Sequence, residues 1–342
     1  MTSAVSGVRP PVPPADLRLE LSAAAALVGG ARDVTLVAHV HPDADALGSA
    51  LALGLALHRR GATVRVTFAE PAQAPESLAE LDVAGLLVPP TEVPAAPELL
   101  VALDTASRNR LGALGERIET AGAVLVIDHH VTNDRFGTHN LVDAGAEATV
   151  VLVLQLLDEL DIGLDEPVAR CLYAGLVTDT SCFRRAGQRT HAIAGRLLAA
   201  GVDPTATTRT LLDTHPFGWL GMLGGVLARA ALDPSAARGL GLVHATIRLA
   251  DSAGLRTEEL ESVVDLVRTT AEAEVAAVLK EIAPGEWSVS LRAKEALDVS
   301  AAAAELGGGG HRLAAGFSAT GCAEDVLTAL RAALHAAPLL AG

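Results

Sequence analysis

The sequence predicts an α/β protein, with a parallel sheet in an N-terminal domain and a smaller α/β domain joined to it by a helical connector. The chain has 342 residues, which suits about two domains of roughly 100–200 residues each. Half of the residues are apolar but only 2% are aromatic, which favours helices and buried parallel strands over an aromatic-rich all-β fold. Short apolar runs alternate with helical patterns, as in βαβ units.

Short apolar runs predict the strands of the first domain, and periodic segments predict its helices. The run Val34–Ala38 is typical of a buried strand, and the periodic segment Ala46–Arg60 ends at Gly61, a common helix stop. Such helices provide the right-handed crossovers that parallel strands need. Further strands are predicted at 63–68, 99–103 and 123–127, and further helices at 21–30, 108–120, 166–178 and 190–200.

The pattern changes after Leu232, where strands and helices again alternate but in shorter units. Strands are predicted at 240–247, 274–281 and 287–292, and helices at 257–270, 299–306 and 324–336. The first 14 residues contain four prolines and no periodic pattern, which is typical of a flexible tail. We therefore expect a tail at 1–14, a catalytic domain at 15–200, a helical connector at 201–239 and a second domain at 240–342.

Charge narrows the class of partner. The formal net charge is -15, and Lys and Arg occur in pairs such as Arg59-Arg60 but in no longer run. Proteins that hold long nucleic acids by their phosphates normally present a basic face, so a long polyanion is not expected as the main partner. A short one remains compatible with this charge, because bound metal ions can supply positive charge locally.

The cysteines and the apolar runs bear on the compartment. Cys171, Cys182 and Cys322 are far apart and form no C-x-x-C, so we expect ordinary buried thiols in a reducing environment. No run of 18 or more apolar residues predicts a membrane span. The apolar segment 21–30 follows acidic residues and lacks a basic start, so we interpret it as a helix, not a signal peptide. A cytoplasmic protein without a membrane partner is expected.

Acidic and histidine side chains follow three predicted strands, and another acid closes a helix. The first strand is followed by His39, Asp43 and Asp45 in an H-x-x-x-D-x-D pattern. Sites in parallel sheets form beyond the carboxyl ends of the strands, so these groups are expected to converge. An isolated Asp at such a place is commonly a helix cap or a turn residue, and Asp43 or Asp45 could cap the next helix. The remaining members of the set are Asp104, Asp128, His129, His130 and Asp179.

The composition of this set predicts a metal centre. Mixed carboxylate and imidazole ligands suit Mn, Fe, Co or Zn better than a purely oxygen-bound Mg site, and the absence of Cys argues against structural zinc. More ligands are available than one ion needs, which predicts two ions that share a carboxylate. Paired ions of this kind are suited to in-line displacement at phosphorus.

These motifs resemble the DHH phosphoesterase family. The resemblance rests on the H-x-x-x-D-x-D pattern, Asp104, the triplet Asp128-His129-His130 and Asp179, and Asn133–Gly137 is also similar. It implies two divalent ions, most commonly Mn²⁺. Residues His39, Asp43 and Asp104 would hold one ion, and the other would be held by Asp45, Asp104, His129 and Asp179. It also implies that Asp104 bridges the ions, that Asp128 orients the histidines and that His130 touches the scissile phosphate.

A run of four glycines is the other prominent feature. Gly307–Gly310 precede His311 and Arg312, and glycines let backbone N–H groups approach an anion closely. A flexible linker is the alternative, although an apolar segment resumes at once. Ser290–Lys294 lies upstream of the run.

Together the two segments resemble the domain attached to DHH domains in the NrnA-type subgroup. That subgroup comprises oligoribonucleases that also cleave 3'-phosphoadenosine 5'-phosphate (pAp), with relatives that cleave cyclic di-AMP and its linear product pApA. The resemblance implies a homodimer, and an active site in an interdomain cleft where short oligonucleotides or small nucleotides bind. The implied substrate contacts are His311, Arg292, Gly308, Gly309, Gly310 and, near the fourth motif, Arg184.

Two enzymatic alternatives share the metal motifs. A class II inorganic pyrophosphatase or exopolyphosphatase would act on pyrophosphate, and a RecJ-like exonuclease would act on single strands. The glycine run favours a nucleotide over pyrophosphate, and the acidic charge disfavours the extended groove of an exonuclease. A regulatory nucleotide-binding protein with an inactive site is a third possibility, which the complete motif set disfavours.

Overall fold

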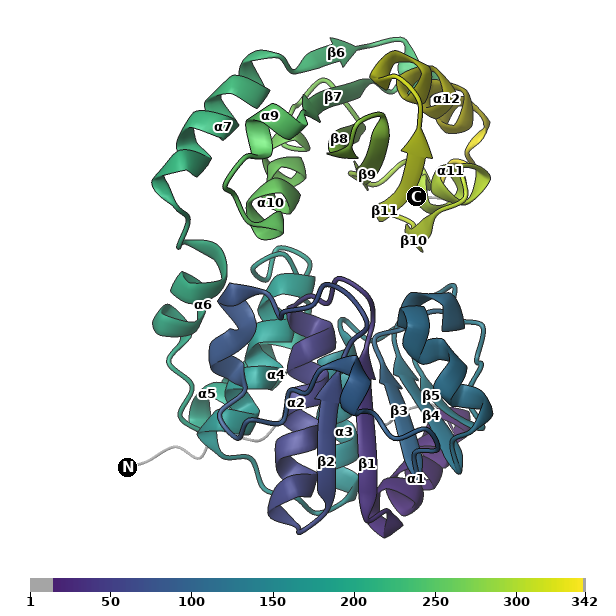
Figure 1. Cartoon of the computed structure of the whole chain (residues 1–342). Helices are drawn as coiled ribbons and strands as arrows, with labels where there is room; N and C mark the ends of the chain where they lie inside the picture. The colour runs from purple at the N-terminus through teal and green to yellow at the C-terminus, as the bar shows by residue number, and fades with distance from the viewer. Residues whose placement is uncertain (1–14, 341–342) are drawn as a thin grey trace. The chain divides into compact units, whose positions relative to one another are not determined.

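The computed structural model describes residues 15–340, and the predicted tail at 1–14 lies outside these residues. The chain divides into two compact units, which we call unit 1, ending at Thr214, and unit 2, beginning at His215. The division falls inside the range 201–239 predicted for the connector. Each unit contains one sheet with helices on it, as Figure 1 shows.

Unit 1 is built on a parallel sheet of five strands in the order β2-β1-β3-β4-β5. The four strands predicted from apolar runs are confirmed, and β5 was not predicted. Only one residue of β5 is fully buried, so the segment lacks the apolar run that marks a central strand. The strands are β1 (Asp33–Ala38), β2 (Thr63–Thr67), β3 (Leu99–Leu103), β4 (Ala123–Asp128) and β5 (His139–Val142).

The helices predicted in unit 1 are present, although one of them is of a different type, and the helices at 76–81, 90–92, 149–159 and 204–212 were not predicted as separate elements. The segment predicted as a helix at 108–120 is the 3-10 helix η3 (Arg108–Glu119), which is interrupted at Gly112 with φ of 55°. A side chain at Gly112 would come within 2.9 Å of both Val40 and Ala69. The others are α1 (Ala15–Gly30), α2 (Ala44–Arg59), α3 (Thr149–Glu159), α4 (Glu166–Asp179), α5 (Gln188–Ala199), α6 (Pro204–Leu212), η1 (Glu76–Leu81) and η2 (Pro90–Glu92).

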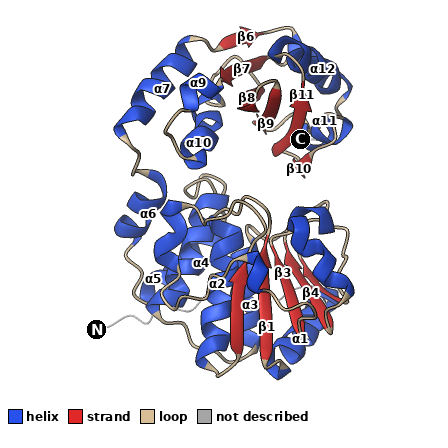
Figure 2. Cartoon of the chain, in the orientation of Figure 1, coloured by secondary structure: helices blue, strands red, loops and turns tan. Residues whose placement is uncertain are grey.

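The sheet of unit 1 is covered on both faces, which explains why its central strands are apolar throughout. Successive residues of β1 point to opposite faces. Leu36 packs in the core shared with the α-helices, whereas Val37 packs in the core shared with η3. Figure 2 shows the helices gathered against the sheet.

The strand order places a crevice at the carboxyl ends of β1 and β3. The chain continues from β1 to β2 on one side and returns to β3 on the other side of β1. In open α/β sheets with this order, ligands bind at the point where the connections diverge. The segments after β1 and β3 carry the first two predicted motifs.

Unit 2 is a mixed sheet of six strands in the order β10-β11-β9-β8-β7-β6, in which only β7 and β8 pair in parallel. The predicted strands correspond to β7, β8 and β9, and the other three were not predicted. The strands are β6 (Ala231–Asp233), β7 (Leu242–Ile247), β8 (Val275–Ala283), β9 (Glu286–Ala293), β10 (Gly309–His311) and β11 (Ala314–Thr320).

Two separate apolar cores cover the faces of this sheet. One face packs against α8 (Ala236–Gly239), α11 (Val299–Glu305) and α12 (Ala323–Ala336). The other packs against α7 (Phe217–Ala228) and α10 (Thr257–Val267), and α9 (Leu249–Ser252) lies beside α7.

The glycine run is part of this sheet and not a flexible linker. Gly307 has φ of 81° and ends α11, where Gly308 N–H donates to the Ala303 carbonyl at 2.8 Å. This is the Schellman geometry, which favours glycine. Gly309 and Gly310 belong to β10, and a side chain at Gly308 would lie 2.0 Å from the Gly316 carbonyl of β11. Close packing against β11 is therefore a structural reason for part of the run.

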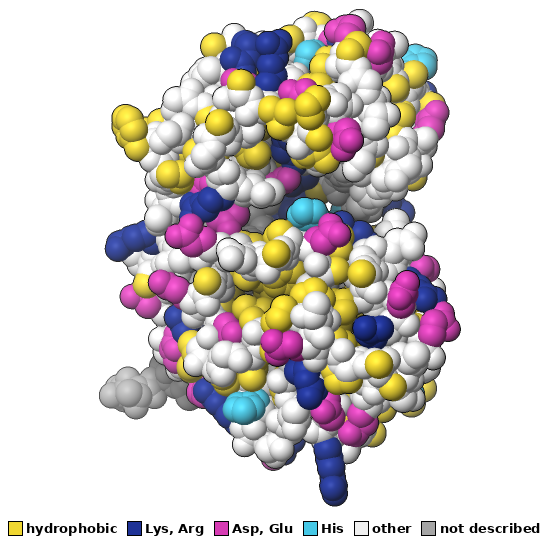
Figure 3. All heavy atoms as spheres, viewed as in Figure 1, with side chains coloured by type: hydrophobic (Ala, Val, Ile, Leu, Met, Phe, Trp, Pro, Cys, Tyr) yellow, Lys and Arg dark blue, Asp and Glu magenta, His cyan; other side chains and the backbone are white. Residues whose placement is uncertain are grey.

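The structure bears on two further expectations, the burial of the cysteines and the absence of a membrane span. Cys171 is buried as predicted, but Cys182 and Cys322 are exposed, because each lies in a loop just outside a helix. No helix between residues 15 and 340 is long and apolar enough to span a bilayer. On the face shown in Figure 3, Lys and Arg side chains are scattered among Asp and Glu and form no continuous basic surface.

Candidate metal centre and active site

The turn after β1 brings His39, Asp43 and Asp45 to the crevice. Asp43 caps α2, since one of its oxygens accepts the N–H groups of Asp45 and Ala46 at 3.0 Å each. Its other oxygen, Oδ2, lies 3.9 Å from Nε2 of His39. The cap interpretation and the ligand interpretation of Asp43 are therefore compatible, because each uses a different oxygen.

Asp104 lies at the centre of the cluster. It directly follows β3 with φ of 57°, a left-handed conformation that is uncommon for residues other than glycine and recurs at functional sites. Its Oδ2 is 3.6 Å from Nε2 of His39, and its Oδ1 is 3.6 Å from Nε2 of His129. Asp104 belongs to three of the groups of His and Asp side chains in unit 1 that could hold a metal ion.

His129 gathers the remaining carboxylates. Its Nε2 lies 3.3 Å from Asp179 and 3.8 Å from Asp45, in addition to its contact with Asp104. Asp179 is the last residue of α4, so this helix delivers the fourth predicted motif to the crevice. Segments separated by up to 140 residues thus place four carboxylates and two imidazoles within one cluster.

Asp45 is fixed by the helix that follows β5. Its two oxygens accept the backbone N–H groups of Thr149 at 2.7 Å and Val150 at 2.9 Å, the first residues of α3. The N-terminus of a helix favours a carboxylate in this position. Gly175 of α4 permits the approach, because a side chain there would lie 2.8 Å from Oδ1 of Asp45 and 2.6 Å from Val150.

Asp128 is fully buried and holds His130. Its Oδ1 lies 2.7 Å from Nδ1 of His130, and its Oδ2 accepts the Asn133 amide at 2.6 Å. The Asn133 amide also donates to the Thr105 carbonyl at 3.1 Å, which anchors it to the loop after β3. Because Nδ1 of His130 faces Asp128, Nε2 is the nitrogen that can address a substrate.

Burial and neighbouring charges shift the pKa values of several side chains in this cluster. Burial and the charge of Asp104 raise the pKa of Asp45 well above its usual value, and burial raises the pKa of Asp179 to about 7. Burial also acts to raise the pKa of Asp104, but its hydrogen bond with His39 and the neighbouring histidine charges outweigh burial and lower it. Burial acts to lower the pKa of His130, but its hydrogen bond to Asp128 and the charges of Asp104, Asp128 and Asp179 together outweigh burial and raise the pKa to about 9.

The donor set fits divalent metal ions. Nδ1 of His39 lies 2.8 Å from the Val40 carbonyl, and Nδ1 of His129 lies 3.2 Å from the Ala146 carbonyl. Donation from Nδ1 leaves Nε2 of each ring as the nitrogen that faces the carboxylates, as in histidines that bind metals. Two ligand atoms at roughly 2.1 Å from one ion are separated by roughly 3.0–3.6 Å. The observed N···O separations of 3.3–3.9 Å are close to this spacing.

The substrate contacts that the resemblance implies lie in a turn of unit 1 and on strands of unit 2 or next to them. Arg184 is exposed in the turn after Asp179, beyond three residues with positive φ at 181–183. His41 is exposed with φ of 54°. In unit 2, Arg292 lies on β9, and His311 and two of the glycines lie on β10.

Sequence reasoning missed two residues that hold the cluster in place. Thr149 donates its hydroxyl to Oδ1 of Asp104 at 2.9 Å, and the Asn133 amide holds Asp128. Asn133 was noted only for its resemblance to the family. No pattern marks Thr149, which begins a helix far from the motifs. A third neighbour, Arg110 of η3, lies 3.1 Å from Nδ1 of His39.

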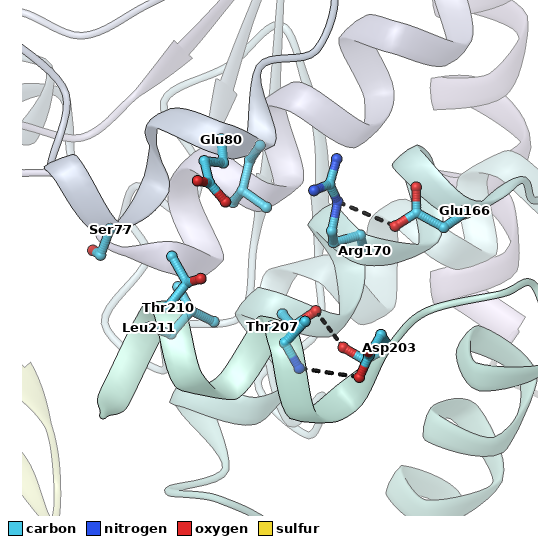
Figure 4. Close-up of a pocket in the computed structure, with 10 residues that line it drawn as sticks. Ser77, Glu80, Glu166, Arg170, Asp203, Thr207, Thr210 and Leu211 are labelled. Carbon is cyan, nitrogen blue, oxygen red and sulfur yellow. Dashed lines mark hydrogen bonds and ion pairs between the residues drawn. The ribbon is translucent and has the colours of Figure 1, made fainter. Parts of the chain in front are cut away.

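A separate pocket of about 130 Å³ opens between η1, α4 and α6, as Figure 4 shows. It contains no predicted site residue. Arg170 within it lies 3.2 Å from Glu166, and Asp203 caps α6. Arg170 lies two and a half turns before Asp179 on α4, or roughly 13 Å along the helix. The pocket is therefore distinct from the metal cluster.

Family models match both units of the chain. The model described as "DHH family, N-terminal domain" matches residues 33–176, and the model described as "DHHA1 domain" matches residues 239–337. The matched part of unit 1 contains all of the cluster except Asp179. The chain therefore belongs to the DHH family of metal-dependent phosphoesterases and carries a DHHA1 domain.

Within this family, the chain is similar to the "Bifunctional oligoribonuclease and PAP phosphatase NrnA" of Thermus thermophilus. The two are 32% identical over 314 residues, which cover 90% of this chain and 92% of the relative. The "Probable bifunctional oligoribonuclease and PAP phosphatase NrnA" of Streptococcus mutans is 27% identical, covering 85% of this chain and 91% of that protein.

A solved structure shares the fold across both units. An exopolyphosphatase-related protein from Bacteroides fragilis superposes with a TM-score of 0.81 at 21% identity, covering 93% of this chain and 96% of its own. At this identity the likeness concerns the fold alone. Both proteins therefore share the α/β fold, which in this chain contains two sheets.

Proposed function

We propose that this chain is a two-metal phosphoesterase that hydrolyses short oligoribonucleotides and small nucleotides such as pAp, pApA or cyclic di-AMP. The observation that carries the proposal is the position of Asp104, which contacts both metal-facing histidines within a cluster of four carboxylates. Similarity to NrnA proteins over nine-tenths of the chain supports the substrate class.

The ligand sets follow from the contacts of the two histidines. His39, Asp43 and Asp104 would hold one ion. Asp45, Asp104, His129 and Asp179 would hold the other, with Asp104 shared. Imidazole with carboxylate suits Mn²⁺, Fe²⁺, Co²⁺ or Zn²⁺, and the resemblance to the DHH family favours Mn²⁺ among them. When bound, such ions activate water and offset the negative charge that develops on the phosphoryl group.

The protein side chains orient the reacting groups. The α3 N-terminus fixes Asp45, and the Thr149 hydroxyl fixes Asp104, so the carboxylates are held before substrate arrives. Asp128 holds His130 through Nδ1, so Nε2 of His130 would donate to the scissile phosphate. Preorganised donors of this kind stabilise charge that develops in the transition state.

Unit 2 would bind the rest of the nucleotide. Arg292 is in register with Ala314, and Ala314 is in register with His311, so the three residues form one row across β9, β11 and β10. Residues in such a row share a face of the sheet, and two strand spacings separate Arg292 from His311 by roughly 10 Å. The small side chain of Ala314 leaves space between the guanidinium of Arg292 and the imidazole of His311. Such a space suits a phosphate beside a planar base.

Short substrates agree with the charge of the chain. The net charge is -15, and the longest Lys/Arg runs are pairs. Two divalent ions with Arg292 and His311 would balance a few phosphates but not a long strand. The rate of RNA hydrolysis should therefore fall steeply for substrates longer than roughly five nucleotides.

A substrate panel tests the proposal. Purified protein with Mn²⁺ is assayed on RNA of two to five nucleotides, a 20-nucleotide RNA, pAp, cyclic di-AMP and pyrophosphate. We expect turnover of short RNA or small nucleotides, and no turnover by Asp104→Ala. His311→Ala should mainly raise KM for nucleotides. Turnover of pyrophosphate alone would replace the proposal with a pyrophosphatase, and full activity of Asp104→Ala would refute the shared-ligand role.

A further inference from the structure

Arg110 places a positive charge beside the metal centre of unit 1. It lies on η3, in the segment that follows Asp104, and its Nη2 is 3.1 Å from Nδ1 of His39. Arginine only donates hydrogen bonds, and Nδ1 of His39 already donates to the Val40 carbonyl at 2.8 Å when Nε2 faces a metal ion. Two donors cannot bond to each other, so the ring provides no acceptor for the guanidinium. The position of this cation therefore needs another explanation.

An ion pair within the protein does not provide that explanation. No Asp or Glu among residues 15–340 lies within ion-pairing distance of Arg110, whereas Arg108 on the same element pairs with Glu119. Arg110 is also exposed, so its side chain is not needed to fill a core. The guanidinium therefore remains available to an anion that comes from outside the protein.

Backbone contacts hold Arg110 in this place. The Arg110 carbonyl accepts the Val40 N–H at 2.8 Å, directly after His39. Gly112 permits this close approach, because a side chain there would come within 2.9 Å of Val40. None of these contacts involves the guanidinium. Replacing the side chain of Arg110 should therefore leave η3 and the turn after β1 in place.

The charge of the metal centre explains why a further cation is useful. Two divalent ions carry as much positive charge as the four carboxylates assigned to them carry negative charge. The charge of a bound phosphate must therefore be balanced by side chains around the ions. A guanidinium suits this role, because it is always charged and its planar fork matches the oxygens of a phosphate.

We propose that Arg110 binds the phosphate oxygen that a phosphomonoester has and a phosphodiester lacks, which makes it a specificity determinant for nucleotides with a terminal phosphate. The proposal rests on the function proposed above. A diester has two unesterified oxygens, which the two ions and His130 bind. A monoester has a third, and it needs a donor beside the ions. Arg110 is such a donor, separated from an ion at Nε2 of His39 only by the imidazole ring.

Hydrolysis of pAp gives a product that probes this contact without a nucleotide. The oxygen of water forms a bond to phosphorus while the bond from phosphorus to the ribose oxygen breaks. A proton passes to the ribose oxygen, and the products are AMP and inorganic phosphate. Inorganic phosphate keeps all three unesterified oxygens of the monoester, so it should still contact Arg110.

Arg110→Ala tests the proposal in two measurements. Calorimetric titration of the Mn²⁺-loaded protein with inorganic phosphate should show a Kd about 10–100-fold higher, the effect of losing a hydrogen bond between charged groups. The kcat/KM for pAp should fall by a similar factor, and that for RNA of two to five nucleotides by much less. Arg110→Lys keeps the charge but not the fork, and should retain part of both. Arg108→Ala, on the same element, is the matched control and should resemble the wild type.

Three results would overturn the proposal. The first is an absence of phosphate binding by the wild type, or an unchanged phosphate affinity in Arg110→Ala. The second is an equal loss of kcat/KM for pAp and for short RNA, which would remove the preference for monoesters. The third is a matching loss of Mn²⁺ affinity, measured in a separate titration, which would show that Arg110 acts through His39.

Failure of the proposed function gives a different result. A wild type that hydrolyses no nucleotide would end the assignment as a nucleotide phosphoesterase. Binding of inorganic phosphate that is lost in Arg110→Ala and kept in Arg108→Ala would still establish the contact between Arg110 and a phosphate. The titration with inorganic phosphate therefore tests Arg110 independently of turnover.

Discussion

The hydroxyl of Thr149 donates a hydrogen bond of 2.9 Å to Oδ1 of Asp104. Both groups are buried, and Thr149 also provides the first N–H of α3 to Asp45. One residue at the start of a helix therefore holds two of the carboxylates that we assign to metal ions.

Thr149→Val should weaken metal binding without unfolding the protein. The backbone bond to Asp45 remains, but Asp104 loses its hydroxyl donor, and loss of such a partner typically costs 10–100-fold in metal affinity. Calorimetric titration with Mn²⁺ measures the change. Thr35→Val is the control, because Thr35 is buried in β1 and its hydroxyl has no hydrogen-bond partner among residues 15–340. Equal Mn²⁺ affinity in the two variants would contradict the role of the hydroxyl.

Asn133→Ala should lower kcat by about 10–100-fold while leaving Mn²⁺ affinity nearly unchanged. The amide restrains Asp128, which in turn orients His130, and neither contact involves the carboxylates assigned to metals. Steady-state kinetics on a preferred short substrate provide the measurement. Asp134→Ala changes the next, exposed residue and should retain activity. A similar loss in both variants would indicate a general effect on the loop.

Gly175→Ala should destabilise unit 1 by about 1–3 kcal/mol, the usual cost of overpacking a core. The added methyl would lie 2.6 Å from Val150 and 2.8 Å from Asp45, so Asp45 must shift. Gly195→Ala is the matched helical control, since the space above Gly195 is open and alanine should stabilise α5 by about 0.5–1 kcal/mol. Urea unfolding compares the two, and opposite signs are expected.

Metal ions should raise the thermal stability of the wild type, and chelators should lower it. A ligand present at 100 times its Kd stabilises the native state by about 2.7 kcal/mol. Asp179→Asn should abolish most of the Mn²⁺-dependent rise in Tm. In EDTA it should be at least as stable as the wild type, because it removes a charge from a crowded carboxylate cluster. Asp158→Asn, a surface residue paired with Arg196, should keep the full response to Mn²⁺.

The central strands and the acidic motifs could be predicted because both follow from local patterns. A strand buried on two faces must be a continuous apolar run, and β1, β3 and β4 are such runs. The polar groups after them were assigned to one site because parallel strands end at a common edge. The convergence of Asp43, Asp45 and Asp104 with His39 agrees with that expectation.

The edge strands and the supporting residues could not be predicted, for a related reason. β5, β6 and β10 are three or four residues long and have only one fully buried residue between them, so no apolar run marks them. Thr149 and Asn133 act through contacts with residues that are distant or ordinary in sequence. A hydroxyl at a helix start and an amide in a loop have many possible roles, and only the fold selects the carboxylate that each one meets.

The contact between Asp45 and the first turn of α3 affects how relatives should be compared. Since both oxygens of Asp45 accept N–H groups, a descendant that had lost catalysis would still need this aspartate in order to fold. Asp179, whose carboxylate makes no comparable bond to the backbone of residues 15–340, would be under no such constraint. Within an alignment, the residue at position 179 should therefore distinguish catalytically active relatives from inactive ones better than the residue at position 45.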